Sequence, residues 1–250
     1  MNPDVAYLIR LGDTALVAGQ RLAEWCGHGP ILEEDIALTN ISLDLIGQAR
    51  MLLDEAGKRE GQGRTEDTLA FHRDVFDFYN LQITEQPNGD FGCTIAKIFF
   101  LSSFQFVQYK ALLESEDEFL KAFAAKSLKE VQYHVKHARD WVVRLGDGTD
   151  ESRTRMQGGI DQMWPFTGEL FGDDDQVEKT LSASGVAPLN GTLEAEWMNI
   201  VDSVLAEATL TKPDSARHFK GGKSGSHTEH LGYLIAEMQF LPRAYPDATW

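Results

Sequence analysis

The chain has 250 residues, enough for one large helical domain or for a domain with a substantial appendage. Its formal net charge of −16 argues against nucleic-acid binding, which needs cations to neutralise phosphates, and against close contact with anionic membranes. A hydrophobic share of 42% and a charged share of 25% are typical of a soluble globular protein, and we expect a cytoplasmic one.

Glycine and proline breakers divide the first part of the chain into long predicted helices. These helices are expected at about 3–26, 32–60, 65–85, 91–113 and 118–145. The longest apolar stretch lies around 98–106, and polar residues interrupt it, so we expect no membrane span. No segment combines a period of two with many β-branched residues, so we predict no sheet.

The second part of the chain is less regular. Shorter helices are expected at about 150–164, 174–184, 192–210 and 228–240, and the segment 212–226, rich in glycine and lysine, predicts a long loop. Cys26 and Cys93 lie in no Cys-x-x-Cys pattern, so we expect two free, buried thiols. The prediction is therefore one all-α domain over 1–250, with a four-helix-bundle core at about 3–146 and a helical extension with a long loop at about 147–250.

Two of the long helices carry an interior stripe with alternating spacings of three and four. Such spacing keeps one seam of a helix against its neighbours, as in a bundle. In the helix over 32–60 the stripe consists of Leu38, Ile41, Leu45, Gln48 and Leu52. In the helix over 118–145 it consists of Leu128, Val131, Val135, Ala138, Val142 and Leu145, with His134 one turn beyond Val131.

These stripes resemble the metal-binding halves of a di-iron bundle from which the ligands have been removed. Such a centre needs about four carboxylates and two histidines, including a Glu-x-x-His pair from each of two helices. The pairs would fall at Leu45 with Gln48, and at Val131 with His134. Leucine and valine cannot ligate, and the helix over 91–113 contains no Asp or Glu. We therefore predict no bound metal and no catalytic residue in this chain.

A shifted register leaves a residual polar cluster. It comprises Asp44, Glu130, His134 and His137. These side chains either hold one metal ion weakly or form a network of hydrogen bonds and ion pairs. In such a network a cationic side chain beside a carboxylate replaces the positive charge of the lost iron. We favour the network, because the helical carboxylates that such metal sites need are missing.

Two other groups have competing interpretations. The run His227-Thr228-Glu229-His230 resembles a ligand cluster, but Ser226 with Glu229 has the spacing of a capping box. A second group is a local basic patch, which comprises Lys212, Arg217, Lys220 and Lys223. It either binds a phosphate group such as that of coenzyme A or belongs to a solvent-exposed loop, and we favour the loop.

Several blocks in a fixed order resemble one family across nearly the whole chain. The chain resembles the structural C subunits of bacterial 1,2-phenylacetyl-CoA epoxidases. The blocks are the runs 21–28, 41–50 and 85–89, the pattern Glu130-x-x-Tyr133-His134, and the runs 221–223 and 227–232.

The resemblance implies a ferritin-like fold and a place in a multicomponent monooxygenase of phenylacetate catabolism. It implies a non-catalytic subunit that binds and stabilises a homologous catalytic subunit, which carries the di-iron centre and converts phenylacetyl-CoA to its ring 1,2-epoxide. It also implies a small accessory subunit and a reductase that contains flavin and an iron–sulfur cluster. No cofactor is expected in this chain.

Two other functions stay open at this point. An autonomous ferritin-like di-iron oxidase would bind iron itself, and the absence of carboxylates over 91–113 argues against it. A helical adaptor unrelated to oxygenases would have no influence on phenylacetyl-CoA turnover.

Overall fold

The computed structural model describes residues 1–172, 176–246 and 248, and these residues contain helices and no strand. The α-helices are α1 (Pro3–Ala23), α2 (Leu32–Glu60), α3 (Glu66–Phe71), α4 (Gln82–Glu85), α5 (Phe91–Leu112), α6 (Glu118–Gly146), α7 (Asp150–Met163), α8 (Gln176–Ala183), α9 (Glu194–Glu207) and α10 (Glu229–Ala244). Short 3-10 helices are η1 (Val75–Asp77), η2 (Trp164–Phe171), η3 (Asn190–Leu193) and η4 (Gly222–Ser224). The all-α prediction is confirmed for the described residues.

Local chemistry sets the ends of the long helices. The side chain of Asp90 accepts a hydrogen bond from the backbone N–H of Cys93 at the start of α5, and Asp117 does the same for Leu120 at the start of α6. At the end of α2, Gly61 has φ +69°, the left-handed conformation that glycine adopts without steric cost. These caps place α2, α5 and α6 within two residues of their predicted bounds.

The single helix predicted over 65–85 is wrong. The structure has α3, η1 and α4 there, with extended backbone between them. Arg73 interrupts the helix, because its buried guanidinium donates to the backbone oxygens of Leu69 and Asp77 and to the carboxylate of Asp13 in α1. A bond to a distant carboxylate thus takes precedence over local helix propensity. The predicted start of the helix at 174 falls outside the described residues.

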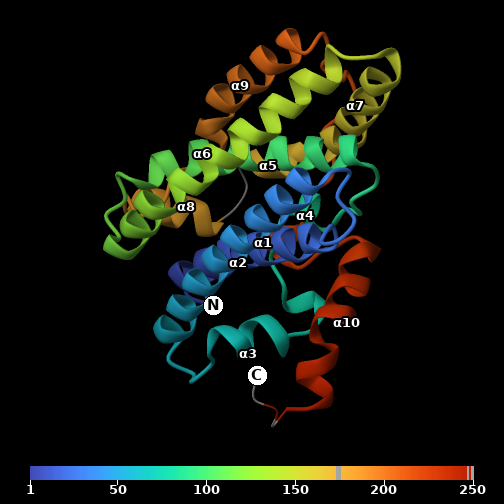
Figure 1. Cartoon of the computed structure of the whole chain (residues 1–250). Helices are drawn as coiled ribbons and strands as arrows, with labels where there is room; N and C mark the ends of the chain where they lie inside the picture. The colour runs from blue at the N-terminus through green and yellow to red at the C-terminus, as the bar shows by residue number, and fades with distance from the viewer. Residues whose placement is uncertain (173–175, 247, 249–250) are drawn as a thin grey trace. The chain divides into compact units, whose positions relative to one another are not determined.

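The chain divides into two compact units, Met1–Pro87 with Gly221–Trp250, and Asn88–Lys220. In the first unit α1 and α2 pack side by side, and α10 returns to contact α1, α3, α4 and η1 (Figure 1). The close packing of α1 on α2 is specific, since a Cβ on Gly12 would come within 2.8 Å of Leu53 Cδ2. The single domain over 1–250 stays a prediction.

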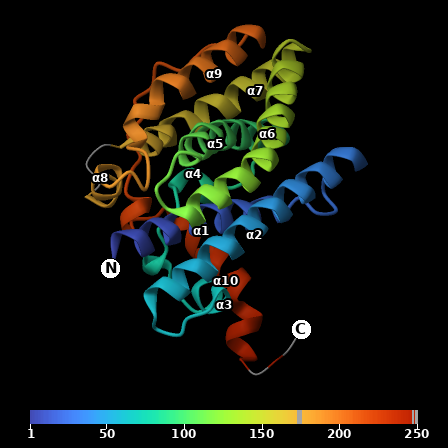
Figure 2. The ribbon, with the colours of Figure 1, turned by 90° about the vertical axis from the view of Figure 1, so that its left-hand side faces the viewer.

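In the second unit α5 is the central helix, and α6, α7 and α9 pack around it (Figure 2). Its interior is aromatic: the ring of Phe100 lies 5.8 Å from the rings of both Trp164 and Trp197, and the Trp197 indole N–H donates to the backbone oxygen of Phe100. By length and composition α5 is long and apolar enough to cross a membrane, but 89% of that stretch is buried within the protein. That burial is typical of the core helix of a soluble protein.

Two adjacent glycines of α7 give opposite predictions. A Cβ on Gly159 would lie 2.8 Å from the backbone oxygen of Gly92 and 2.9 Å from Cys93 N, whereas a Cβ on Gly158 would meet nothing within 4 Å. We expect Gly159→Ala to lower the free energy of unfolding by about 1–3 kcal/mol, because α7 must move away from α5. Gly158→Ala is expected to raise it by about 0.5–1 kcal/mol through helix propensity. Urea denaturation of the two variants and of the wild type measures both changes, and equal effects would contradict the α5–α7 packing.

Candidate functional site

The first unit holds one of the two predicted ligand-pair positions. Leu45 and Gln48 lie on the buried face of α2 together with Leu38, Ile41 and Leu52, as the spacing predicted. The half-buried Asp44 lies beside this face. The position of the expected glutamate is therefore inside the protein and is filled by a leucine side chain.

The second unit holds the other pair. Val131 and His134 of α6 are both fully buried, at 0% and 1% exposure. The predicted seam of α6 is confirmed in part: Val131, Ala138 and Val142 are buried, whereas Leu128, Val135 and Leu145 are only half-buried, and Ser127 and His134 lie on the buried face instead. The prediction therefore included three residues from one edge of the buried face, because a β-branched or leucine side chain at the edge is as apolar as one at the centre.

The polar neighbourhood of His134 is aromatic as well as acidic. The ring of Tyr133 lies 6.4 Å from the ring of His134 and 6.1 Å from that of His137. On the facing helix α5, burial raises the pKa of the Tyr109 hydroxyl well above its usual value, and the negative charge of Glu130 raises it further. The structure therefore brings Glu130, His134 and His137 onto neighbouring turns of α6, next to a neutral phenol.

Charge in α5 is the reverse of what a di-iron centre needs. Its buried charged side chain is Lys97, whose ammonium donates to Asn88 Oδ1 at 3.0 Å, while Lys110 is exposed and paired with Glu196. Among residues 1–172 and 176–246, no group of three or more His, Cys, Asp or Glu side chains is placed to hold a metal ion. With leucine and valine at two ligand positions, the residues present do not fit a di-iron centre.

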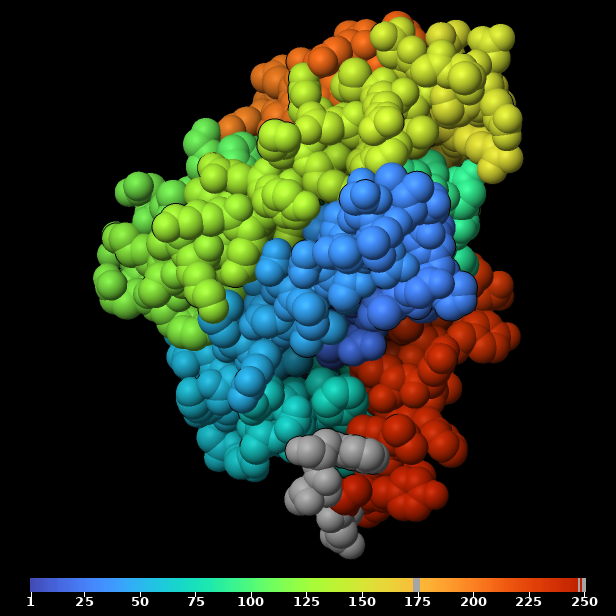
Figure 3. All heavy atoms as spheres, in the orientation of Figure 1, coloured from blue at the N-terminus to red at the C-terminus, as the bar shows by residue number. Residues whose placement is uncertain are grey.

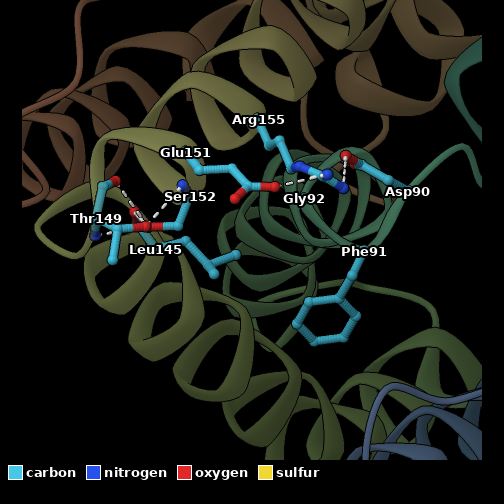
Figure 4. Close-up of a pocket in the computed structure, with 8 residues that line it drawn as sticks. All are labelled: Asp90, Phe91, Gly92, Leu145, Thr149, Glu151, Ser152 and Arg155. Atoms are coloured by element: carbon cyan, nitrogen blue, oxygen red, sulfur yellow. Dashed lines mark hydrogen bonds and ion pairs between the residues drawn. The ribbon is translucent and has the colours of Figure 1, made fainter.

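A separate pocket of about 370 Å³ lies where α5 begins and α7 follows α6 (Figure 4). Arg155 extends across it, 2.8 Å from a Glu151 carboxylate oxygen and 3.8 Å from Asp90. Ser152 donates to the backbone oxygen of Leu145 at 2.7 Å and forms a capping box with Thr149. These polar groups satisfy one another and the ends of the helices, so the pocket has a structural explanation.

The basic residues of the 212–223 segment have several internal partners. Arg217 donates to Thr167 Oγ1 at 2.9 Å, pairs with Glu194, and lies 5.5–5.6 Å from the ring centres of Trp164, Phe171 and Trp197. Lys212 pairs with Asp202 at 2.8 Å. Arg217 therefore anchors the loop to the aromatic core of the second unit. It fits neither of the two interpretations from the sequence, a phosphate site or a solvent-exposed loop.

Two other sequence-based expectations need correction. The helix α10 begins after Thr228 and has no side-chain cap, so the predicted capping box of Ser226 and Glu229 is wrong; the Thr228 hydroxyl donates to Glu85 instead. Both cysteines are free, but Cys26 is exposed and only Cys93 is buried. Burial raises the pKa of the Cys93 thiol.

Sequence reasoning missed the polar groups whose partners are distant. The burial of Lys97 and Ser127 was not predicted, nor was the contact of Glu85 with His227 across 142 residues. The one available signal was the run 82–86, in which Ile83 is the single apolar residue among polar ones.

Comparison with known proteins places the chain. The family model for phenylacetic acid catabolic proteins matches residues 1–250. The chain is 49% identical over 250 residues, the full length of both proteins, to the C subunit of the 1,2-phenylacetyl-CoA epoxidase of Escherichia coli (strain K12). A solved structure, Protein 19 with aldehyde deformylating oxidase activity from Synechococcus, aligns with a TM-score of 0.53 at 15% identity over 84% of this chain and 93% of that one.

The structural likeness shows the fold alone and confirms the predicted ferritin-like, all-α class. The sequence matches confirm the resemblance that was seen in the separate blocks along the chain, and they connect the chain with phenylacetate catabolism. This chain belongs to the family of phenylacetic acid catabolic proteins.

Proposed function

We propose that this chain is the non-catalytic structural subunit of a phenylacetyl-CoA ring 1,2-epoxidase. In this role it binds a homologous di-iron catalytic subunit and stabilises that subunit's helices. The observation that carries the proposal is the filling of the ligand-pair positions by Leu45 and Val131, both buried, in a chain 49% identical to a protein named as the C subunit of such an epoxidase.

A structural subunit needs a surface that docks. The outer face of α2 carries large apolar side chains in water: Leu32 is 73% exposed, Ile36 52% and Leu43 60%. They recur at spacings of four and seven, so they form one stripe along the helix. Atoms of α2 lie at the molecular surface, blue in Figure 3. An exposed apolar stripe on a long helix is typical of a protein–protein contact, and we assign it to the catalytic subunit.

The rest of the assembly follows from this role. The di-iron centre belongs to the catalytic partner, the complex also includes a small accessory subunit, and a flavin- and iron–sulfur-containing reductase supplies electrons. No nucleic acid and no membrane takes part, and the complex is cytoplasmic. The composition of α5 supports the assignment of the iron to the partner, because this helix carries no Asp or Glu and its buried charged side chain is the ammonium of Lys97.

Iron content tests the proposal against an autonomous oxidase. The purified chain and the purified catalytic subunit are each incubated anaerobically with ferrous iron, desalted and analysed for metal. We expect about two irons per catalytic subunit and no stoichiometric iron in this chain, because an O/N ligand set is missing. About two irons per molecule of this chain would overturn the proposal and favour the autonomous oxidase.

A further inference from the structure

A fully buried carboxyl group in the first unit lies among several hydrogen-bond donors. The Glu85 side chain at the end of α4 is 0% exposed. One of its oxygens accepts from Asn80 Nδ2 at 3.2 Å, and the other from the backbone N–H of Thr228 at 2.8 Å and its hydroxyl at 2.6 Å. Several donors on one carboxylate stabilise its ionised form. A buried negative charge then needs a cation beside it.

His227 lies in the position of that cation. Its Nδ1 is 2.8 Å from Glu85 Oε1, and its Nε2 is 2.8 Å from the backbone oxygen of Phe78. A carbonyl oxygen and an ionised carboxylate only accept hydrogen bonds, so both ring nitrogens must donate. A neutral imidazole donates from one nitrogen only. Beside an ionised Glu85 the ring, whose side chain is 2% exposed, must therefore carry both protons; in either case the Nδ1–Oε1 contact needs one proton between the two atoms.

The ion pair joins segments that are far apart in sequence. Glu85 ends α4, whereas His227 lies just before α10, in the part of the chain that returns to the first unit at Gly221. Neighbouring bonds follow the same path: Gln82 Nε2 donates to the backbone oxygen of Ser226 at 2.7 Å. α10 is thereby held against α1, α3, α4 and η1.

The other charged groups around the pair have partners or positions of their own and do not take the place of the His227 ring beside the Glu85 side chain. Arg21 of α1 donates to the backbone oxygens of Glu85 and His230, at 2.8 and 3.3 Å, and its remaining charge is paired with Glu24 at 2.6 Å. On the α10 side, Glu229 and His230 lie two and three residues after His227, and Glu229 is exposed. His227 supplies a countercharge within hydrogen-bond distance of the Glu85 side chain.

We propose that Glu85 and His227 form a proton-dependent latch that holds α10 on the first unit. An undocked histidine loses its proton near pH 6.5, while the docked ring must keep it to make both bonds. Above that pH the docked form therefore binds more protons than the undocked form, and docking weakens as pH rises. Docking is fully favoured below about pH 6.5, where both forms are protonated.

The latch controls a surface. A groove of about 690 Å³ runs between η1 and α10, with the exposed aromatic side chains of Phe76 and Phe240 on opposite walls. One wall belongs to η1 and the other to α10, so the groove exists only while α10 is docked. Deprotonation of His227 thus couples the pH of the medium to the presence of this apolar surface.

Two measurements on the full-length chain test the latch. Long-range ¹H–¹⁵N spectra of histidine-labelled protein, with the His227 signal assigned by its loss in His227→Gln, are expected to show protons on both ring nitrogens at pH 7.5. Hydrogen exchange of residues 229–244, corrected for the intrinsic effect of pH, is expected to show an opening constant that rises by up to about tenfold per pH unit above pH 6.5.

The variants make the result specific. His227→Gln is expected to exchange faster in α10 at pH 6.5 and to lose the pH dependence, while His230→Gln, a matched change three residues away, keeps it. A neutral His227 ring at pH 7.5, or the same pH dependence in His227→Gln as in the wild type, would overturn the latch. If His227→Gln does not fold, the wild-type spectrum, assigned by a triple-resonance experiment, decides alone.

Discussion

Replacing Leu43 with glutamate is expected to weaken binding of the chain to the catalytic subunit at least about thirtyfold, the factor that corresponds to about 2 kcal/mol. Leu43 is exposed in the isolated chain, so the substitution costs the folded monomer little. In the complex we propose that it is buried, and a carboxylate there would lose its water without gaining a partner. Binding is measured by titration of the labelled catalytic subunit.

Three controls distinguish a loss of docking from a loss of folding and from non-specific hydrophobic association. Thermal unfolding of Leu43→Glu should match the wild type, and Leu43→Met should bind normally because its volume and polarity are similar. Tyr233→Glu removes a large hydrophobic side chain that is more exposed than Leu43, at 76% against 60%, from α10 of the same unit and should leave binding unchanged. If Tyr233→Glu weakens binding and Leu43→Glu does not, the assignment of the α2 stripe as the docking face is wrong.

Arg73→Ala is expected to lower the free energy of unfolding by about 3–5 kcal/mol, the largest stability effect that we predict. Arg73 and Asp13 form a buried bidentate pair, with side chains 6% and 0% exposed. The backbone N–H of Tyr79 donates to the same carboxylate at 2.9 Å, and the Arg73 guanidinium lies 4.2 Å from the centre of the Phe78 ring. Without the arginine, the Asp13 carboxylate keeps its burial and loses its countercharge.

A matched arginine provides the comparison. Arg50 of α2 also pairs with a carboxylate, that of Glu66 at 3.3 Å, but its side chain is 77% exposed. Arg50→Ala is expected to change the free energy of unfolding by at most about 1 kcal/mol, because water screens the pair and solvates the remaining glutamate. Urea denaturation followed by circular dichroism measures both variants. Similar losses would show that burial does not govern the Asp13–Arg73 contribution.

Where local signals decide, the sequence predicted the structure well. The bounds of α2 and α5 follow from breakers and caps at Gly61 and Asp90, which act within a few residues. The helix predicted over 65–85 failed because the partners of Arg73 include Asp13, which is 60 residues away. No local pattern contains that bond, so helix propensity gave the wrong answer there.

The candidate site shows the same division. The burial of Leu45, Gln48 and Val131 was predictable, because a seam with spacings of three and four needs only the geometry of one helix. The burial of Lys97 and the pairing of Glu85 with His227 were not, since each depends on which distant segment returns to cover the side chain. The burial of residues along one helix could therefore be predicted from the sequence, whereas contacts between distant segments could be found only in the structure.

Turnover of phenylacetyl-CoA in a reconstituted system tests the central claim most directly. The catalytic subunit, with its iron, accessory subunit and reductase, is assayed alone, with this chain, and with Leu43→Glu. We predict that turnover depends on the wild-type chain, although this chain binds no iron. With the variant, turnover should fall at protein concentrations below the variant's dissociation constant for the catalytic subunit. Equal turnover with and without the chain would contradict its role as the structural subunit.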